Sequence, residues 1–291
     1  MPLTLIKGQF RVVGASPDGD SVRFYPDRAD AFSAARLKVR TNSRGGVQLR
    51  LDGIDALETH YRPRVAGAEL WRQPKELADA AGAELLRYLG FTKVERDEGG
   101  RVSASTPGET SGHILTRFAD KYGRAVAFAF PGQRAGRSTD GGSVHLDPKA
   151  LKASANFRLL ETGLAYPTFY SKLYPDLRQA MADAAVAART AGNGVWEHDV
   201  TNSGFRLTSR AQLRDDVVLL PKLFRRLVDY LSLDETDGVS LAGFADYVDT
   251  RNDRLFTIPD GHATELHTLL SVRRQTLKLT TPPERIVFEE A

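Results

Sequence analysis

The sequence contains no cysteine, which excludes several kinds of site at once. Disulfides, thiolate zinc sites, iron–sulfur clusters and a cysteine nucleophile all need that residue. Long apolar runs are missing too, since no stretch reaches the roughly 18 residues that a membrane-spanning helix needs. The N-terminal segment combines an early Lys7 with a broken apolar pattern. We therefore expect no secretory signal, no membrane partner and a cytoplasmic location.

Neither sign of charge dominates the chain, whose net charge is +3 over 291 residues. Hydrophobic residues make up 41% and charged residues 26%, as in soluble globular proteins, so a wholly disordered chain is excluded. The basic excess lies in the first 200 residues, because 12 Lys and Arg stand against 14 Asp and Glu from residue 201 onward. Such an excess is compatible with an anionic partner such as nucleic acid, and equally with compositional scatter.

Nucleotide-binding and zinc-helix motifs are also missing. The glycine-rich stretches lack the strand–helix context of a P-loop or a dinucleotide-binding turn. His262 and His267 are five residues apart, whereas two zinc ligands on one helix face are separated by four. We therefore expect both to be surface histidines, and His60 to be a solvated side chain.

What is present is a run of short strands followed by helices, which indicates an α+β fold. We expect five or so strands to form a small, partly open barrel of the oligonucleotide-binding (OB-fold) type. The predicted strands cover residues 3–13, 21–25, 47–54, 113–118 and 125–130. The predicted helices cover residues 74–89, 149–163 and 175–191, and the predicted loops cover 26–46, 97–112 and 131–148.

Residues 201–291 are expected to form a separate, small and mostly helical accessory domain. Pro221–Leu231 predicts an amphipathic helix, with Arg225 and Arg226 on its solvated face. A further helix is expected around residues 262–273 and a strand around 285–289. The role of this region is open; partner binding, homo-oligomer formation and regulation are the alternatives.

Four short segments combine residue types that could act on a phosphate group. They are residues 18–20 (DGD), Arg50 within LRLDGID, residues 55–59 (DALET) and residues 120–124 (DKYGR). Each has a plain structural alternative when taken singly. The first triplet is typical of a turn, the acidic pair of a helix N-terminus, and the two arginines of surface charges.

Together, the four segments resemble the staphylococcal nuclease (thermonuclease) family. SPDGDSV, LRLDGIDALE and ADKYGRAVAFAF occur in the family's order, followed by NFRLLETGLAYPTFY and by Trp196 after AGNGVW. The resemblance covers approximately residues 3–200 and implies an OB-fold barrel with helices. It also implies a Ca²⁺-dependent nuclease that hydrolyses DNA or RNA phosphodiester bonds with little sequence preference.

The resemblance assigns a metal site to acidic residues of two segments. Asp20 and Asp55 would ligate Ca²⁺, or another divalent metal, together with the backbone carbonyl of Ala56. Glu58 would lie beside the attacking water as its general base. Carboxylates about 4 Å apart repel by roughly 4 kcal/mol at an effective dielectric constant of 20, so this group of acids needs a cation.

The resemblance assigns phosphate recognition to Arg50 and Arg124. A guanidinium group matches two phosphate oxygens, and its charge favours the transition state, in which the phosphate gains negative charge. Further substrate contacts are implied for Lys121, Tyr122, Phe169 and Tyr170.

Several features leave alternatives open. Core packing is as reasonable for Phe169 as contact with a base. Leu57 stands where the family has proline, which predicts a looser Glu58. The competing class of protein is a non-catalytic module of the same fold that binds nucleic acid or another protein.

Overall fold

The computed structural model describes residues 2–290 except 64, 66, 134, 135, 137 and 235–237. The chain divides into two compact units. The first unit comprises residues 1–52, 81–159 and 175–180, and the second comprises 53–80, 160–174 and 181–291. The chain therefore passes from one unit to the other five times. The division predicted at residue 200 stays a prediction.

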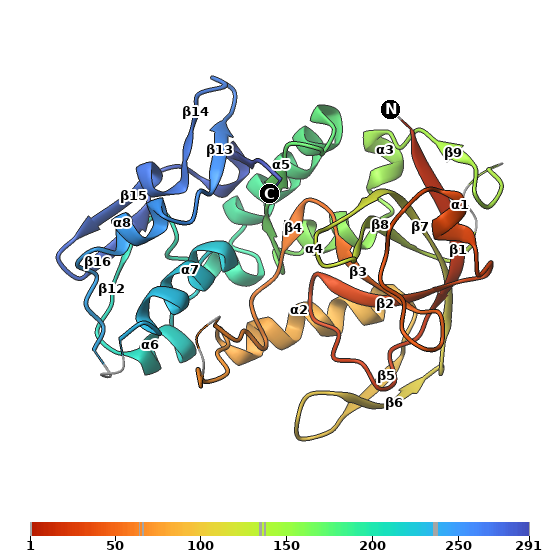
Figure 1. The fold of residues 1–291 in the computed structure, drawn as a ribbon, viewed down its shortest axis with the longest axis horizontal. Helices are drawn as coiled ribbons and strands as arrows, with labels where there is room; N and C mark the ends of the chain where they lie inside the picture. The colour runs from red at the N-terminus through yellow and green to blue at the C-terminus, as the bar shows by residue number, and fades with distance from the viewer. Residues whose placement is uncertain are drawn as a thin grey trace. The chain divides into compact units, whose positions relative to one another are not determined.

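A closed, mixed five-stranded barrel forms the centre of the first unit (Figure 1). Its strands follow one another around the barrel in the order β1, β2, β3, β8 and β7, and β7 pairs with β1 again. All neighbours are antiparallel except β3 and β8, which run parallel. The strands are β1 (Leu3–Phe10), β2 (Ser21–Pro26), β3 (Val47–Leu51), β7 (Thr110–Ala119) and β8 (Ala125–Pro131).

Apolar residues on alternate strand positions fill the barrel. Phe10 and Phe24 are fully buried and their rings meet edge to face, 5.2 Å apart between centroids. Gly112 on β7 leaves the room for this packing, because a Cβ there would lie 2.2 Å from the Phe10 ring. The α+β fold and the five-stranded barrel are confirmed, and the barrel is closed rather than partly open.

The helices of the first 200 residues agree with the predictions at two of three places. The helix α2 (Lys75–Tyr88) and the helix α5 (Pro175–Thr190) lie where expected. The helix predicted over 149–163 is instead two pieces, α3 (Pro148–Leu151) and α4 (Ala155–Glu161). Asp147 caps the first piece, and the Ser154 hydroxyl accepts the backbone N–H of Phe157 at the start of the second, so each piece begins at its own cap.

Regions predicted as loops contain short elements. Residues 97–112 include β6 (Val102–Thr106), which pairs with β5 (Lys93–Arg96). The helix α1 (Ala31–Ala34) lies within residues 26–46, and β9 (Ser143–Val144) lies within 131–148 and pairs with β1.

Three small sheets and three α-helices lie wholly within the described residues of the second unit. One sheet pairs β4 (Ile54–Asp55) with β10 (Tyr166–Pro167). The second has the order β11 (Phe169–Tyr170), β17 (Ile286–Phe288), β13 (Arg254–Thr257) and β14 (Ala263–Glu265). The third has the order β12 (Phe205–Arg206), β16 (Thr276–Leu279) and β15 (Leu270–Arg273). The helices are α6 (Arg210–Asp215), α7 (Pro221–Leu231) and α8 (Phe244–Asp249), beside the 3-10 turns η1 (Gly194–Glu197), η2 (Leu266–Leu269) and η3 (Pro283–Arg285).

The helix predicted around 262–273 is wrong, and the expectation of a mostly helical C-terminal region is corrected with it. These residues form β14, η2 and β15. β15 pairs with β16 around a tight turn in which Arg274 takes a positive φ of 55°. The strand predicted around 285–289 is confirmed as β17. Among the described residues, no helix is long and apolar enough to cross a bilayer.

Candidate functional site

Asp20, Arg50 and Arg124 lie on neighbouring strands of the barrel. Asp20 precedes β2, where its carbonyl accepts the backbone N–H of Leu51 on β3 at 2.8 Å. Arg50 on β3 is half-exposed, between residues that are fully buried. Arg124 immediately precedes β8, the parallel neighbour of β3. The first unit thus brings one predicted acid and both predicted phosphate-binding arginines to adjacent strands.

The DKYGR segment is a turn that positions Arg124. The Asp120 carboxylate accepts the backbone N–H groups of Tyr122 and Arg124, each at 2.9 Å, and the Arg124 Nε–H at 2.7 Å. Gly123 has a φ of +79°, a conformation that favours glycine. A Cβ at Gly123 would also lie 2.9 Å from the Cβ of Arg40. These residue types therefore have a structural reason as well as the functional one that the resemblance implies.

Two of the predicted substrate contacts lie on the surface of this turn. Lys121 is exposed and its Nζ lies 5.7 Å from the centroid of the Tyr122 ring. Tyr122 is 51% exposed, and the Arg124 guanidinium carbon lies 5.6 Å from the centroid of its ring. An exposed ring beside two cations suits a nucleotide, which offers both a phosphate and a base.

The other two predicted contacts lie in the second unit and differ from each other. Phe169 is fully buried, opposite Val287 of β17. This position favours core packing, the alternative reading of Phe169, over contact with a base. Tyr170 is half-buried, with its ring centroid 5.9 Å from that of Phe288, and its substrate role stays a prediction.

The acidic segment belongs to the second unit and is rigidly held there. Asp55 is buried on β4. The backbone N–H of Glu58 donates to Gln73 Oε1 at 3.1 Å, and the carbonyl of Glu58 accepts the Gln73 N–H at 2.8 Å. Gln73 is fully buried, and its Nε2 donates to the Leu219 carbonyl at 2.8 Å. Hydrogen bonds therefore hold the backbone of Glu58 without a proline at position 57, and the looser Glu58 stays a prediction.

Arg225 of α7 binds both acids of this segment. Its Nη2 lies 2.7 Å from Asp55 Oδ2 and its Nη1 lies 3.1 Å from Asp55 Oδ1. The same Nη1 donates to Glu58 Oε1. Burial alone would lower the pKa of Arg225, but the attraction of Asp55 and Glu58 outweighs it and raises that pKa well above the ordinary value.

The prediction that Arg225 and Arg226 lie on a solvated face is therefore wrong. Arg226 donates to Asp253, with Nη2 at 2.7 Å from Oδ1. Burial raises the pKa of Asp253, but hydrogen bonds and charges of Arg226 and Lys222 outweigh it and lower the pKa below its ordinary value. The local sequence does not reveal these partners. A stripe of charged residues on a helix has the same sequence pattern whether it faces water or a carboxylate from a distant part of the chain.

A second contact ties the segment that follows Glu58 to the same helix. The Tyr61 hydroxyl donates to Asp229 Oδ1 at 2.7 Å. Asp229 lies one helical turn after Arg225, so both side chains project from the same side of α7. Burial raises the pKa of Tyr61, and the hydrogen bond to Asp229 raises it further.

The residues of the second unit do not fit a bound Ca²⁺ as they are placed. Ca²⁺ takes oxygen ligands, but both carboxylate oxygens of Asp55 and one of Glu58 already accept N–H groups of Arg225. Asp20 lies in the first unit, so its convergence with Asp55 and the Ala56 carbonyl stays a prediction.

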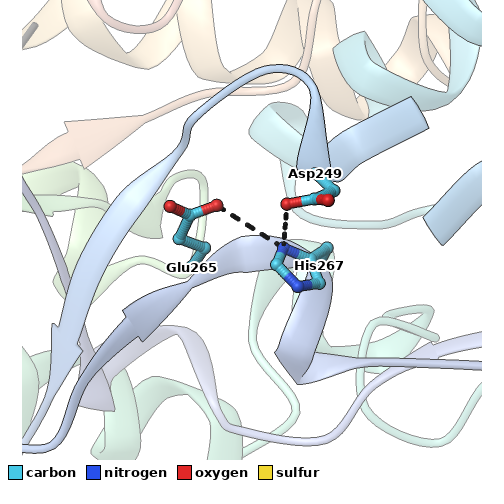
Figure 2. Close-up of side chains that lie close together, drawn as sticks. All are labelled: Asp249, Glu265 and His267. Atoms are coloured by element: carbon cyan, nitrogen blue, oxygen red, sulfur yellow. Dashed lines mark ion pairs between the residues drawn. The ribbon is translucent and has the colours of Figure 1, made fainter. Parts of the chain in front are cut away.

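In the described ranges, one set of three potential metal-ligating side chains clusters, and it lies elsewhere in the second unit. Figure 2 shows His267 of η2 between Asp249 of α8 and Glu265 of β14. His267 Nδ1 lies 3.2 Å from Asp249 Oδ1 and 3.6 Å from Glu265 Oε2. Asp249 is largely exposed. Exposed acidic groups often lie close together without a metal, so this cluster is not part of the candidate site.

No protein-family model matches the chain, and no curated protein sequence matches it either. The resemblance to the staphylococcal nuclease family therefore rests on the quoted segments and on the barrel that carries three of them.

Proposed function

We propose that this protein is a nuclease of the staphylococcal nuclease type, which hydrolyses phosphodiester bonds of DNA or RNA with little sequence preference. The observation that carries the proposal is the placement of Arg50 on β3, with Asp20 immediately before β2 and Arg124 immediately before β8, the two strands that flank β3 in one barrel. In this proposal the guanidinium groups of Arg50 and Arg124 both donate to one phosphate group.

In this proposal the arginines act on the charge of the phosphate. Negative charge increases on the phosphate oxygens in the transition state, so cations fixed beforehand stabilise it more than the ground state. Arg124 is held by Asp120 through its Nε, which orients the guanidinium before the substrate binds. Glu58 is proposed as the general base, and Ca²⁺ as the metal, on the resemblance alone.

Substitution of the arginines tests the proposal. Plasmid digestion at saturating Ca²⁺ should fall by about 100-fold or more in Arg124→Ala and in Arg50→Ala, the usual cost of removing one transition-state contact. Arg87→Ala is the matched control, because Arg87 is an exposed arginine of α2 that pairs with Glu84. Chelation should abolish cleavage. Undiminished cleavage by Arg124→Ala would show that the cutting comes from another site.

One observation favours the alternative, a non-catalytic module that binds nucleic acid. Arg225 neutralises part of the charge of Asp55 and Glu58, the acids on which hydrolysis would depend. A module of this kind would bind an oligonucleotide through Arg50 and Arg124 but would not cut it, whichever divalent metal is added. Measuring both the binding and the cleavage of a labelled oligonucleotide separates the two functions. A nuclease binds and cuts it, whereas the module binds it and leaves it intact.

A further inference from the structure

We propose that Arg225 is the resident cation of the Asp55–Glu58 pair, so that a divalent ion reaches these carboxylates only by displacing the guanidinium group. The inference rests on the proposed function for what the two acids do. The contacts on which it depends lie entirely within the second unit.

The geometry places a positive charge between the two carboxylates. Arg225 binds Asp55 through both Nη atoms and binds Glu58 through one of them, so its guanidinium is shared as a metal ion would be. The side chains of Arg225, Asp55 and Glu58 are 24%, 5% and 17% exposed. Water therefore screens the attraction little, and removal of the arginine would take away a positive charge that both carboxylates bind.

The helix that carries Arg225 is firmly anchored. The apolar side of α7 is buried, and the exposed fraction is at most 1% for Leu223, Phe224, Leu227 and Val228. Asp229, on the same side as Arg225, binds Tyr61 of the acidic segment. Displacement of the guanidinium therefore requires rotation of one long side chain, while α7 stays in place.

Charge balance gives a divalent ion a reason to compete. The guanidinium group carries one positive charge and a divalent ion carries two, so the ion attracts the two carboxylates more strongly than Arg225 does. Ca²⁺ also needs several oxygen ligands, which the guanidinium blocks while it is bound. The natural protein should thus bind Ca²⁺ weakly, with the concentration of Ca²⁺ setting how often Arg225 is displaced.

Calorimetric titration with Ca²⁺ alone tests the proposal on the full chain. Arg225→Met, which keeps much of the length without the charge, should bind Ca²⁺ at least 10-fold more tightly than the natural protein. Arg226→Met is the matched control, because Arg226 lies on the same helix and pairs with Asp253 instead. It should leave Ca²⁺ affinity unchanged. Addition of Glu58→Gln to Arg225→Met should remove the gain.

Arg225→Lys provides a second test if Arg225→Met unfolds. Lysine keeps the charge but loses the two-pronged contact, so Ca²⁺ affinity should rise by a smaller factor than in Arg225→Met. Thermal melting with added Ca²⁺ supplies a further measure, because a tighter ligand raises the melting temperature more. Equal Ca²⁺ affinity in the natural protein and in whichever variant folds would overturn the proposal.

Cleavage assays at limiting Ca²⁺ separate this inference from the proposed function. If Arg225→Met gains Ca²⁺ affinity but cuts no nucleic acid, the resident cation is supported and the nuclease proposal fails. If the natural protein and Arg225→Met cut equally well and bind Ca²⁺ equally well, the nuclease proposal is supported and the resident cation is overturned.

Discussion

At the scale of single residues, buried polar side chains decide how the acidic segment is held. Gln73 is fully buried. Its side-chain oxygen accepts the backbone N–H of Glu58, and its own backbone N–H donates to the Glu58 carbonyl. Its side-chain nitrogen donates to the Leu219 carbonyl. A hydrophobic substitution at Gln73 would leave buried backbone groups without partners, which costs more than the lost hydrogen bonds themselves.

We expect Gln73→Leu to lower the free energy of unfolding by about 2–4 kcal/mol, the cost of one or two buried groups left unpaired. Urea unfolding of the full chain measures this loss. Gln9→Ala is the control, since Gln9 makes an exposed hydrogen bond to Arg11, and it should change stability by less than about 0.5 kcal/mol. Equal effects of the two substitutions would contradict this stabilising role of Gln73.

His113 gives the barrel a dependence on pH. Its ring stacks on Phe130 at 4.8 Å between centroids, its Nδ1 lies 2.6 Å from the Gly132 carbonyl oxygen, and burial lowers its pKa below the ordinary value of 6.5. Because the unfolded chain takes up the proton first, this stability is full above about pH 6.5 and is lost as pH falls towards the lowered pKa.

The check is urea unfolding of the natural protein and of His113→Asn from pH 7.5 to pH 5. The natural protein should lose stability relative to the variant over this range. A difference between the two that stays constant with pH would show that His113 titrates normally in the folded state.

At the scale of elements, the sequence predicts a helix or strand best where the pattern lies within that element alone. Pro221–Leu231 combines an N-terminal proline with apolar residues at helical spacing, and it is the helix α7. Residues 262–273 contain apolar residues that also suit a helix, but the pairing of β15 with β16 overrides that local preference. The sequence does not predict the β5–β6 hairpin, because both strands are largely exposed and so show little apolar alternation.

Removal of an apolar anchor of α7 should be costly. Leu227 is fully buried, so Leu227→Ala should lower the free energy of unfolding by about 2–5 kcal/mol. Leu233, just beyond the helix, is 59% exposed, and Leu233→Ala should cost less than about 0.5 kcal/mol. Urea denaturation of both variants measures the contrast, and a small loss in Leu227→Ala would show that α7 is weakly packed.

At the scale of the whole molecule, each of the two compact units is built from three separate segments of the chain. Residues 53–80 and 160–174 belong with residues 181–291. The sequence could predict the barrel and its arginines, because motif and strand pattern are local there. It could not predict Arg225 as a partner of Glu58, since 167 positions separate them and no periodicity links such residues.

Truncation after residue 200 is therefore expected to disrupt the second unit rather than to release a more active nuclease. The shortened chain loses β17, the partner of Phe169, and Leu219, the partner of Gln73. It should bind a hydrophobic dye and lose near-ultraviolet circular dichroism, which report exposed apolar surface and lost packing. A truncated chain that unfolds cooperatively and cuts faster would contradict this expectation.

The interleaved path of the chain also has a consequence for biosynthesis. Translation proceeds at about 5–20 residues per second, so the 167 positions from Glu58 to Arg225 take roughly 10–30 s to make. The last barrel strand, β8, ends at Pro131, long before α7 and β17 leave the ribosome. During that interval the nascent chain carries Asp55 and Glu58 without their arginine, and only the final stretch of synthesis supplies it.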